Sequence, residues 1–286
     1  MVRTAVAFSP GHISGYFRKI AGESPALTGS IGAGIVIDEG VLATASAAER
    51  REVVVREVDA GGRVRSESQG SPPLEYAMER LNVRAHVETA CRLPIGAGFG
   101  LSAAALLASI TAIDALLELG LSRAEIAAVA HEAEVVHSTG LGDVSACQGG
   151  GIACRETPGP GGRITRIPSD QEIWAVSFGP LPTPDVIGSA EHLERVAAAF
   201  PTGCPTDLEG FFSRSRAFAE ASGLVTADVR SALEACDAGG VLASMTMLGR
   251  GVFATGDGAR EVLAPFTEPI RLNVAESGFH LLEVRG

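Results

Sequence analysis

The sequence has almost no lysine: Lys19 is the only one in 286 residues. The Gly-Lys-Ser/Thr tripeptide of P-loop nucleotide-binding proteins is therefore absent. Acidic residues outnumber basic ones by 34 to 23, which gives a net charge of −11. A negative field of this size disfavours binding to nucleic acid or to an anionic membrane. An anionic substrate would need local basic groups or a metal ion to attract it.

Cysteine pairs and long apolar runs are also missing. The five cysteines form no Cys-x-x-Cys pair, and their odd number argues against a disulfide framework or a zinc site. We therefore expect free thiols in a reducing cytosol, with the cysteines acting as small buried side chains. The first residues lack the apolar segment of a signal peptide, and polar residues interrupt the longest apolar stretch, 102–119. No membrane segment is predicted.

Apolar residues make up 46% of the chain, enough to form the core of one large domain or two modest ones. Hairpin and helix signals mix without a regular strand–helix–strand rhythm. This pattern predicts an α+β fold of two lobes, with helices on mixed or antiparallel sheets. Glycine and proline crowd residues 149–162, the best candidate for a domain boundary. We predict an N-terminal domain over 1–160 and a C-terminal domain over 161–286.

Local patterns predict individual elements. Turn residues at 38–40 and at 60–62 predict two hairpins. Ser122 followed by Glu125 forms a capping box, which predicts the start of a helix. Further strands are expected at 83–89 and 173–178, and helices at 73–81, 102–119, 122–137, 208–222 and 227–237.

The strongest functional signal is the glycine-rich segment 94–103, between a predicted strand and an alanine-rich helix. Gly96, Gly98 and Gly100 let the backbone approach a ligand closely and direct N–H groups at it. The following helix adds the positive end of its dipole, so the segment predicts a phosphate cradle that needs no lysine. Ser102 is placed to bind Mg²⁺ or phosphate; the alternative is a serine that only caps the helix.

Three segments resemble the GHMP kinase superfamily. They are Pro10-Gly11, the glycine-rich segment 94–103, and the segment 247–253. In the second, Leu101 replaces the first of the usual two serines and Ser102 keeps the other; the third lacks the usual glycine run. The chain resembles the archaeal pantoate kinase family more closely still, and over most of its length. The segments that carry this resemblance are 10–17, 29–35, 130–146 and 247–256.

The resemblance implies a two-lobed GHMP kinase fold and a kinase that uses ATP and Mg²⁺ to convert pantoate to 4-phosphopantoate, on the route to coenzyme A. It suggests a homodimer and a magnesium-binding glutamate on the helix over 122–137. The expected ATP-binding residues are Pro94, Gly96, Ala97, Gly98, Phe99, Gly100, Leu101, Ser102 and Ala103. Alternatives are another kinase of the superfamily, for homoserine, shikimate or a mevalonate-like acid, and a non-catalytic nucleotide-binding regulator.

Asp143 lies among glycines and small residues in the segment 139–146. Phosphoryl transfer depends mainly on positioning and on neutralising phosphate charge. We therefore assign Asp143 to accept the proton of the substrate hydroxyl or to orient that hydroxyl. The alternative is an aspartate that only forms a turn.

Two glutamates on the preceding helix are candidates for the metal. At 100° per residue, Glu132 and Glu134 flank opposite sides of the apolar face, so only one readily reaches a shared site. We favour Glu134 as the metal ligand, together with Ser102, because the loop that leads to Asp143 lies on the same side of the helix. Glu132 stays an open alternative. The apolar face is predicted to contain Ile126, Val129, Ala130, Ala133 and Val136, and His137 falls within it as a core histidine.

Four residues are candidates for binding the substrate. Arg155 follows a glycine run and a short strand, and its guanidinium offers a bidentate fork to a carboxylate. His12 lies in the turn-rich loop predicted around Pro10, after the first strand, and is suited to hydrogen bonding with the substrate. Ser30 and Gly32 could approach the substrate from the next strand. A surface ion pair for Arg155 and a tight strand entry at 30–34 are the alternatives.

Overall fold

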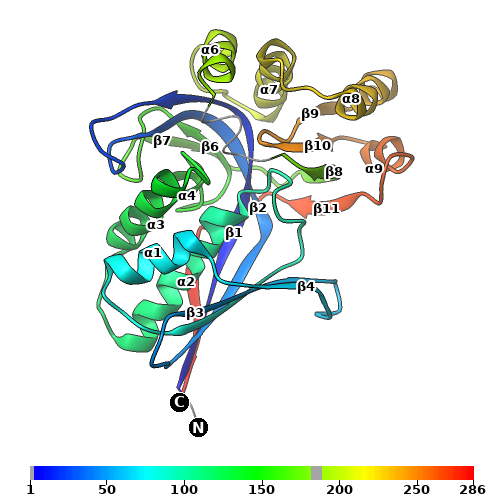
Figure 1. Cartoon of the computed structure of the whole chain (residues 1–286). Helices are drawn as coiled ribbons and strands as arrows, with labels where there is room; N and C mark the ends of the chain where they lie inside the picture. The colour runs from blue at the N-terminus through cyan, green and yellow to red at the C-terminus, as the bar shows by residue number, and fades with distance from the viewer. Residues whose placement is uncertain (1–2, 182–188) are drawn as a thin grey trace.

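The computed structural model of the chain describes residues 3–181 and 189–286, which form two sheets with helices packed on them (Figure 1). The larger sheet contains β1 (Thr4–Ile20), β2 (Gly29–Ser46), β3 (Glu52–Val58), β4 (Val64–Gln69), β5 (His86–Cys91), β6 (Ile152–Arg155), β7 (Ile164–Ile167) and β12 (His280–Arg285). The smaller sheet contains β8 (Glu172–Pro180), β9 (Leu242–Met245), β10 (Gly249–Thr255) and β11 (Ile270–Asn273). The helices are α1 (Pro72–Arg80), α2 (Leu101–Leu117), α3 (Arg123–His137), α4 (Asp143–Ala146), α6 (Ala190–Ala199), α7 (Leu208–Ser222), α8 (Ala227–Gly239) and α9 (Ala259–Leu263).

The larger sheet is mixed. Its main path runs β12-β1-β2-β5-β3-β4, with β6 beside β2 and β7 beside β6. β3 and β5 pair in parallel, while the other described pairs of both sheets are antiparallel. The predicted α+β class with mixed and antiparallel sheets is therefore confirmed. β7 and β12 belong to this larger sheet although both lie beyond residue 160, and the domain boundary there stays a prediction.

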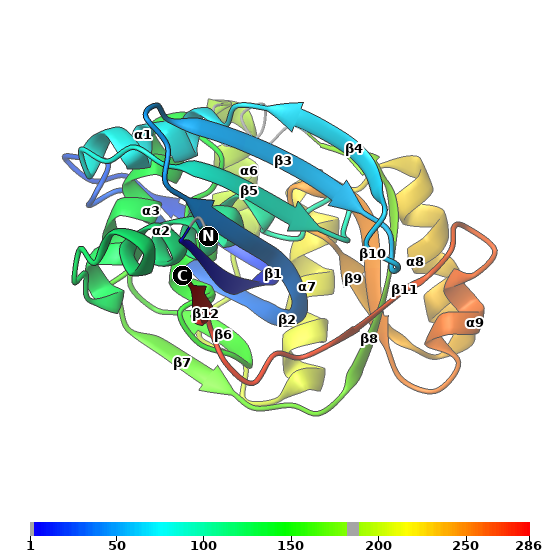
Figure 2. The same cartoon turned by 90° about the horizontal axis from the view of Figure 1, so that it is seen from below.

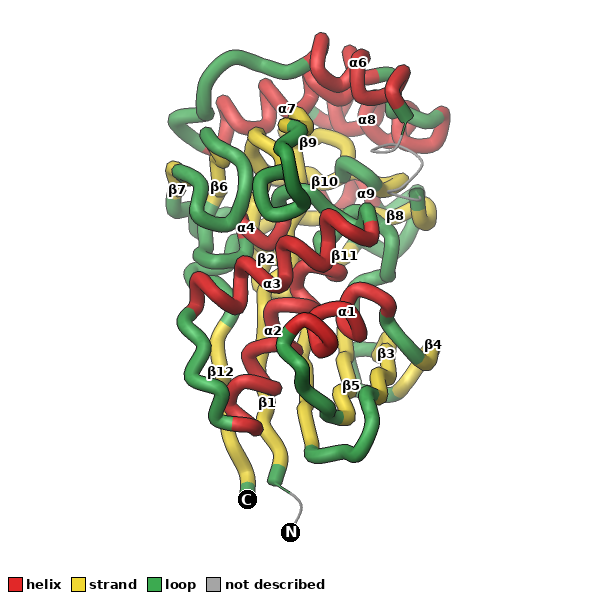
Figure 3. The backbone as a smooth tube through the Cα atoms, turned by 60° about the vertical axis from the view of Figure 1, so that its left-hand side comes forward, coloured by secondary structure: helices red, strands yellow, loops and turns green. Residues whose placement is uncertain are grey.

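Helices pack against two parts of the larger sheet. α2 contacts β1 and β2, and α1 and α3 pack beside it; Figure 2 shows these three helices gathered on the side away from the smaller sheet. α2 is buried nearly all round, as its alanine-rich, almost uncharged sequence requires. At the end opposite the chain termini lie α6, α7 and α8, with α7 against β1 and β9 (Figure 3). No described helix has the length and apolarity needed to cross a bilayer.

Two sequence predictions about the first strands are wrong. Residues 38–40 form no hairpin, because β2 continues through them and pairs with β1 along its length. The pairing register shifts there: Gly40 lies opposite Pro10 and Ile37 opposite Gly11, which leaves two extra residues as a β-bulge. The turn-rich segment around Pro10 is likewise part of β1 and not a loop. The turn signals therefore mark a kink in two long paired strands.

Other local predictions are confirmed. β3 and β4 form the hairpin predicted at 60–62, and α1 begins at a proline as expected. The capping box at the start of α3 is present, with Ser122 accepting from the amide of Glu125. The predicted apolar face of α3 fails in its last turn: Val136 is 45% exposed and His137 only half-buried.

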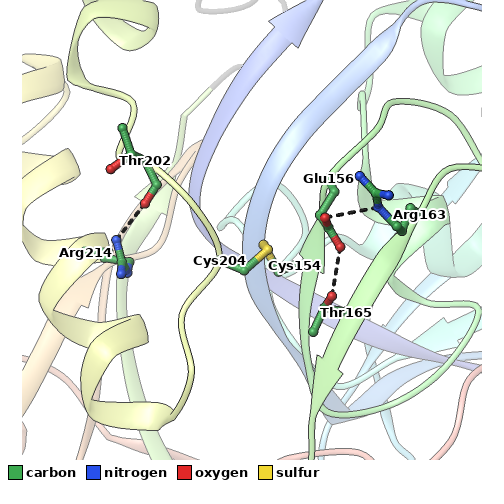
Figure 4. Close-up of a disulfide and its surroundings, with 7 residues drawn as sticks. All are labelled: Cys154, Glu156, Arg163, Thr165, Thr202, Cys204 and Arg214. Carbon is green, nitrogen blue, oxygen red and sulfur yellow. Dashed lines mark hydrogen bonds and ion pairs between the residues drawn. A yellow bond between two sulfur atoms is a disulfide. The ribbon is translucent and has the colours of Figure 1, made fainter.

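The prediction of free thiols is wrong for two cysteines. Cys154 on β6 forms a disulfide with Cys204, in the loop between α6 and α7 (Figure 4). The same loop is held by Arg214 of α7, which donates to the carbonyl of Thr202 at 2.8 Å. The other three cysteines are free and buried, as predicted. Because two cysteines pair, the cysteine content no longer supports a reducing compartment.

The disulfide closes a loop of 50 residues in the unfolded chain. We expect Cys204→Ser to lower the free energy of unfolding by about 2–4 kcal/mol, because the open chain gains conformational freedom when unfolded. Urea unfolding followed by circular dichroism measures the change. Wild-type protein in dithiothreitol should match the variant, and the variant should not respond to the reductant. Equal midpoints for oxidised and reduced wild type would contradict the prediction.

Candidate active site

One cavity brings most of the predicted chemistry together. It has a volume of about 460 Å³ and lies where the glycine-rich segment, α3 and α4 meet. Its polar side is lined by Ser14, Gly96, Gly98, Gly100, Ser102, Glu134, Thr139 and Asp143, and its apolar side includes Val41, Val55, Pro72, Pro73, Phe99 and Leu101. Pro94, Ala97 and Ala103 of the predicted ATP-binding set do not line it. Ala97 and Ala103 are buried in the core and shape the segment from behind.

The glycine-rich segment is packed backbone to backbone against β1. Gly96, Gly98 and Gly100 have φ values of +79°, +86° and +63°. At Gly100 a Cβ would also lie only 3.0 Å from the carbonyl of His12, so both conformation and packing require glycine. The amide of His12 donates to the carbonyl of Phe99 at 2.9 Å. No described side chain caps α2, whose first N–H groups are therefore available to an anion.

The third motif reaches the same place despite its missing glycine run. The amide of Met247 donates to the carbonyl of Ser14 at 3.2 Å, and a side chain at Gly249 would overlap the carbonyl of Ala97. Met247 and Leu248 line the cavity. The backbone of this third motif therefore packs directly against the backbone of the glycine-rich segment.

Glu134 is 1% exposed and projects into the cavity. Burial and the nearby charge of Asp143 raise its pKa to about 8, against the effect of hydrogen bonds from Ser102 and Thr139. Its Oε2 atom is buried and has no hydrogen-bond partner among the described residues. A carboxylate oxygen buried in this way fits a cation ligand.

Glu132 lies on the other flank of α3. The hydroxyl of Tyr76 donates to it at 2.8 Å, and the guanidinium of Arg80 lies 3.5 Å away. The prediction that the two glutamates diverge is confirmed, while metal binding by Glu134 stays a prediction. Within the described ranges, no three His, Cys, Asp or Glu side chains gather as a metal site. Magnesium does not require such a cluster, since it often takes one or two carboxylates together with phosphate oxygens.

Behind Asp143 lies a buried chain of two polar side chains, His12 and Arg155. His12 Nδ1 is 2.5 Å from Asp143 Oδ1, and His12 Nε2 is 3.5 Å from Arg155 Nη1. Burial opposes ionisation of Asp143, but the hydrogen bond and charge of His12 and the charge of Arg155 outweigh it and lower the pKa of Asp143. Burial lowers the pKa of His12, although its contact with Asp143 acts the other way. The geometry fits a neutral His12 that donates from Nδ1 to an ionised Asp143 and accepts from Arg155.

The four predicted substrate residues meet at this buried chain and not on the cavity wall. Gly32 of β2 pairs with Arg155 of β6. A side chain at Gly142 would overlap both Ser30 Oγ and Arg155 Nε, so the turn before α4 packs directly on them. Arg155 is 2% exposed, and its Nε has no partner among the described residues. The surface ion pair proposed as its alternative role is therefore wrong.

The sequence interpretation overlooked His131. This side chain is 1% exposed, and its Nε2 lies 2.7 Å from the carbonyl of Thr28. Its Nδ1 is buried without a partner in the described part of the chain. The available signal was its spacing of three residues from Glu134, which places both on one side of a helix.

Comparisons with known proteins agree with this geometry. A family model described as the GHMP kinases N terminal domain matches residues 73–151. The pantoate kinase of Methanospirillum hungatei JF-1 is 45% identical over 272 residues, which cover 95% of this chain and 94% of that protein. A solved phosphotransferase related to the CoA biosynthesis pathway is 27% identical, with a TM-score of 0.77 and 98% of each chain covered. Homoserine kinase from Cytophaga hutchinsonii is 14% identical, with a TM-score of 0.67 over 98% of this chain and 97% of that one; it shows the fold alone.

Buried histidines give the fold a specific response to acid. Burial lowers the pKa of His131 below its usual 6.5, despite the hydrogen bond to Thr28. Below pH 6.5 the unfolded chain protonates this side chain while the folded protein resists, so its contribution to stability is lost as pH falls. Glu134 has the opposite effect on stability. Its pKa is raised to about 8 in the folded protein, so below about pH 8 the folded state binds a proton that the unfolded chain does not yet bind.

The variant His131→Gln isolates this contribution from that of Glu134. We expect the stability of the variant relative to wild type to improve steadily as pH falls from about 7.5 to about 5.5. Urea unfolding in EDTA across this range gives the difference. A difference that does not change with pH would contradict the prediction.

Proposed function

Because the chain belongs to the pantoate kinase family within the GHMP kinases, we propose that it transfers the γ-phosphoryl group of ATP to the 4-hydroxyl of pantoate. The chain is an ATP-dependent small-molecule kinase. The observation that best supports the proposed site is that Glu134, with a buried unpartnered oxygen, and an ionised Asp143 face the same cavity as the glycine-rich segment.

We propose that the phosphates of ATP lie on the amides of 96–102 and on the N-terminus of α2. No described residue that lines the cavity is a lysine or arginine. Phosphate charge must therefore be balanced by backbone N–H groups, the helix dipole and a metal ion. The apolar side of the cavity, with Val41, Val55 and the prolines at 72–73, offers flat contacts for the nucleotide base.

Glu134 and Ser102 would hold Mg²⁺. The donor set fits, since Glu134 has a buried oxygen without a partner and the hydroxyl of Ser102 hydrogen-bonds with the same carboxylate. A Mg²⁺ ion held there would supply charge neutralisation for the phosphates of ATP. Loss of the Glu134 proton on metal binding follows from its raised pKa.

Asp143 is the group we assign to the acceptor hydroxyl. Its lowered pKa keeps it ionised, so it can take a hydrogen bond from the hydroxyl and accept its proton as the phosphoryl group arrives. His12 holds one carboxylate oxygen from behind, which leaves the other directed to the substrate side.

Arg155 is our candidate partner for the carboxylate of pantoate. It is buried, and its Nε has no hydrogen-bond partner among the described residues. His12 lies between Arg155 and Asp143 and contacts both side chains. Ser30 and the Gly32 backbone lie beside Arg155. In a chain with a net charge of −11, a buried arginine supplies the local attraction that an anion needs.

Several finer points remain predictions. A cytoplasmic location is expected of a metabolic kinase, and neither nucleic acid nor membrane is an expected partner. A homodimer follows only from the family resemblance. Among alternative functions, a non-catalytic regulator is disfavoured by the retained arrangement of Ser102, Glu134 and Asp143 around one cavity. ADP release with a panel of hydroxy acids separates pantoate from homoserine, shikimate or mevalonate-like acceptors.

The two glutamates of α3 provide a matched test of the metal site. We expect Glu134→Gln to weaken Mg²⁺-supported turnover by at least about tenfold, because an amide oxygen carries no charge to hold the cation. Glu132→Gln should stay within about twofold, because that side chain bonds to Tyr76 and Arg80 on the far flank. Turnover is measured against magnesium concentration for both variants. Equal losses at saturating magnesium would overturn the assignment.

Substitution of Arg155 tests the substrate. Arg155→Met should raise KM for pantoate by about tenfold to 100-fold, the equivalent of losing about 1.5–3 kcal/mol of charged hydrogen bonding, and leave KM for ATP nearly unchanged. Arg155→Lys should recover only part of the loss, because an ammonium cannot form the paired contact. If KM for ATP rises instead, Arg155 belongs to the nucleotide. If neither constant moves, the carboxylate binds elsewhere.

A further inference from the structure

The carboxylate of Asp143 is carried by a very short helix. α4 spans only four residues, starts at Asp143, and has no side-chain cap from any described residue. A single turn of helix is unstable alone, because nucleation costs more than one turn of hydrogen bonds returns. Contacts from the rest of the fold must therefore hold α4, and with it Asp143, in place.

Arg166 of β7 supplies three hydrogen bonds at this point, beside the packing of α4 on α2, α3, β1 and β6. Its Nη1 donates to the carbonyl of Gly150 at 2.8 Å, and its Nη2 donates to the carbonyls of Ala146 at 2.8 Å and Ser145 at 3.3 Å. Two of the three acceptors are the last residues of α4, where carbonyls lack partners within the helix. A cation at this end also interacts favourably with the helix dipole.

Small residues beside Arg166 leave room for its side chain to reach the end of α4. Arg166 pairs with Ala153, which pairs in turn with Gly34, so the row of residues beside it carries almost no side chain. Ala146 of α4 packs into the same small cluster as Ala153. A Cβ at Gly149 would lie only 2.8 Å from the guanidinium, so glycine is needed there for the arginine to pass.

We propose that Arg166 is a positioning residue for phosphoryl transfer: it fixes the C-terminal end of α4 and thereby holds the Asp143 carboxylate in line with the acceptor hydroxyl. The proposal rests on the proposed function, in which Asp143 meets that hydroxyl. Arg166 itself does not touch the cavity that holds Asp143 and the glycine-rich segment. Only a planar fork can serve carbonyls on both sides of the turn at 147–149 at once, and a lysine ammonium would reach a subset.

The first experiment compares two arginines of the same hairpin. Arg166→Met should lower kcat by about tenfold to 100-fold, as expected when a catalytic group shifts by about an ångström, and leave KM for ATP within about twofold. Arg166→Lys should retain part of the rate. Arg163→Met is the control, because Arg163 is 73% exposed and pairs only with Glu156 among the described residues. Equal kcat for both methionine variants would overturn the proposal.

A double-mutant cycle then asks whether Arg166 acts through Asp143. If it does, Arg166→Met should change kcat little once Asp143→Asn is present, because the positioned carboxylate is already gone. Equal losses in both backgrounds would assign Arg166 a general structural role and overturn the proposal. If Asp143→Asn alone keeps wild-type turnover, the proposed role of Asp143 fails first, and the inference falls with it.

Chemical rescue covers the case of a poorly folded methionine variant. Arg166 borders a second cavity of about 810 Å³, which gives small molecules access to it. Millimolar guanidinium should restore kcat to Arg166→Ala without changing KM for ATP, and sodium at equal ionic strength should not. Absence of rescue, in protein whose circular dichroism matches wild type, would count against the positioning role.

Discussion

The site depends on keeping one carboxylate ionised inside the protein. Asp143 sits against buried neighbours, where an unpaired charge is costly, and the contact from His12 together with the charge of Arg155 stabilises it. These groups come from β1, α4 and β6, so the pairing joins β1 to two elements whose residues lie 131 and 143 positions further along the chain. In a chain with so many acids, the buried Arg155 behind the site gives Asp143 a locally positive environment.

The glycines support this arrangement in a different way. The bulge of β1 and β2 brings His12 against Gly100, and the third motif brings Gly249 against Ala97. At each contact, backbone lies where a side chain would otherwise be, which keeps α2, β1 and β10 at a fixed separation. The N-terminus of α2 is thereby directed into the same cavity as Glu134 and Asp143, so the proposed phosphate and metal sites share one cavity.

The errors in the sequence interpretation share one physical origin. Asp38-Glu39-Gly40 has the composition of a hairpin turn, yet pairing with β1 along its full length converts it into a bulge. Cys154 and Cys204 are 50 positions apart, and neither spacing nor count indicates that β6 and the loop before α7 meet. Val136 follows the helical period but is 45% exposed. In each case the outcome depends on which distant segments pack against the residue, and a local pattern does not record this.

The sequence by itself determined the fold class, the glycine-rich segment, the family, and the divergence of Glu132 from Glu134, because these depend on periodicity, composition and motif order within short stretches. Only the tertiary structure decided that His12, Asp143 and Arg155 form one buried chain, that His131 is buried near Glu134, and that Arg166 donates to the last carbonyls of α4. Those facts depend on which face of β1, β2, β6 and β7 each side chain occupies. Register sets that face, and register follows from the bulges between β1 and β2 and from strand pairings, of which that of β2 with β6 joins residues more than 100 positions apart.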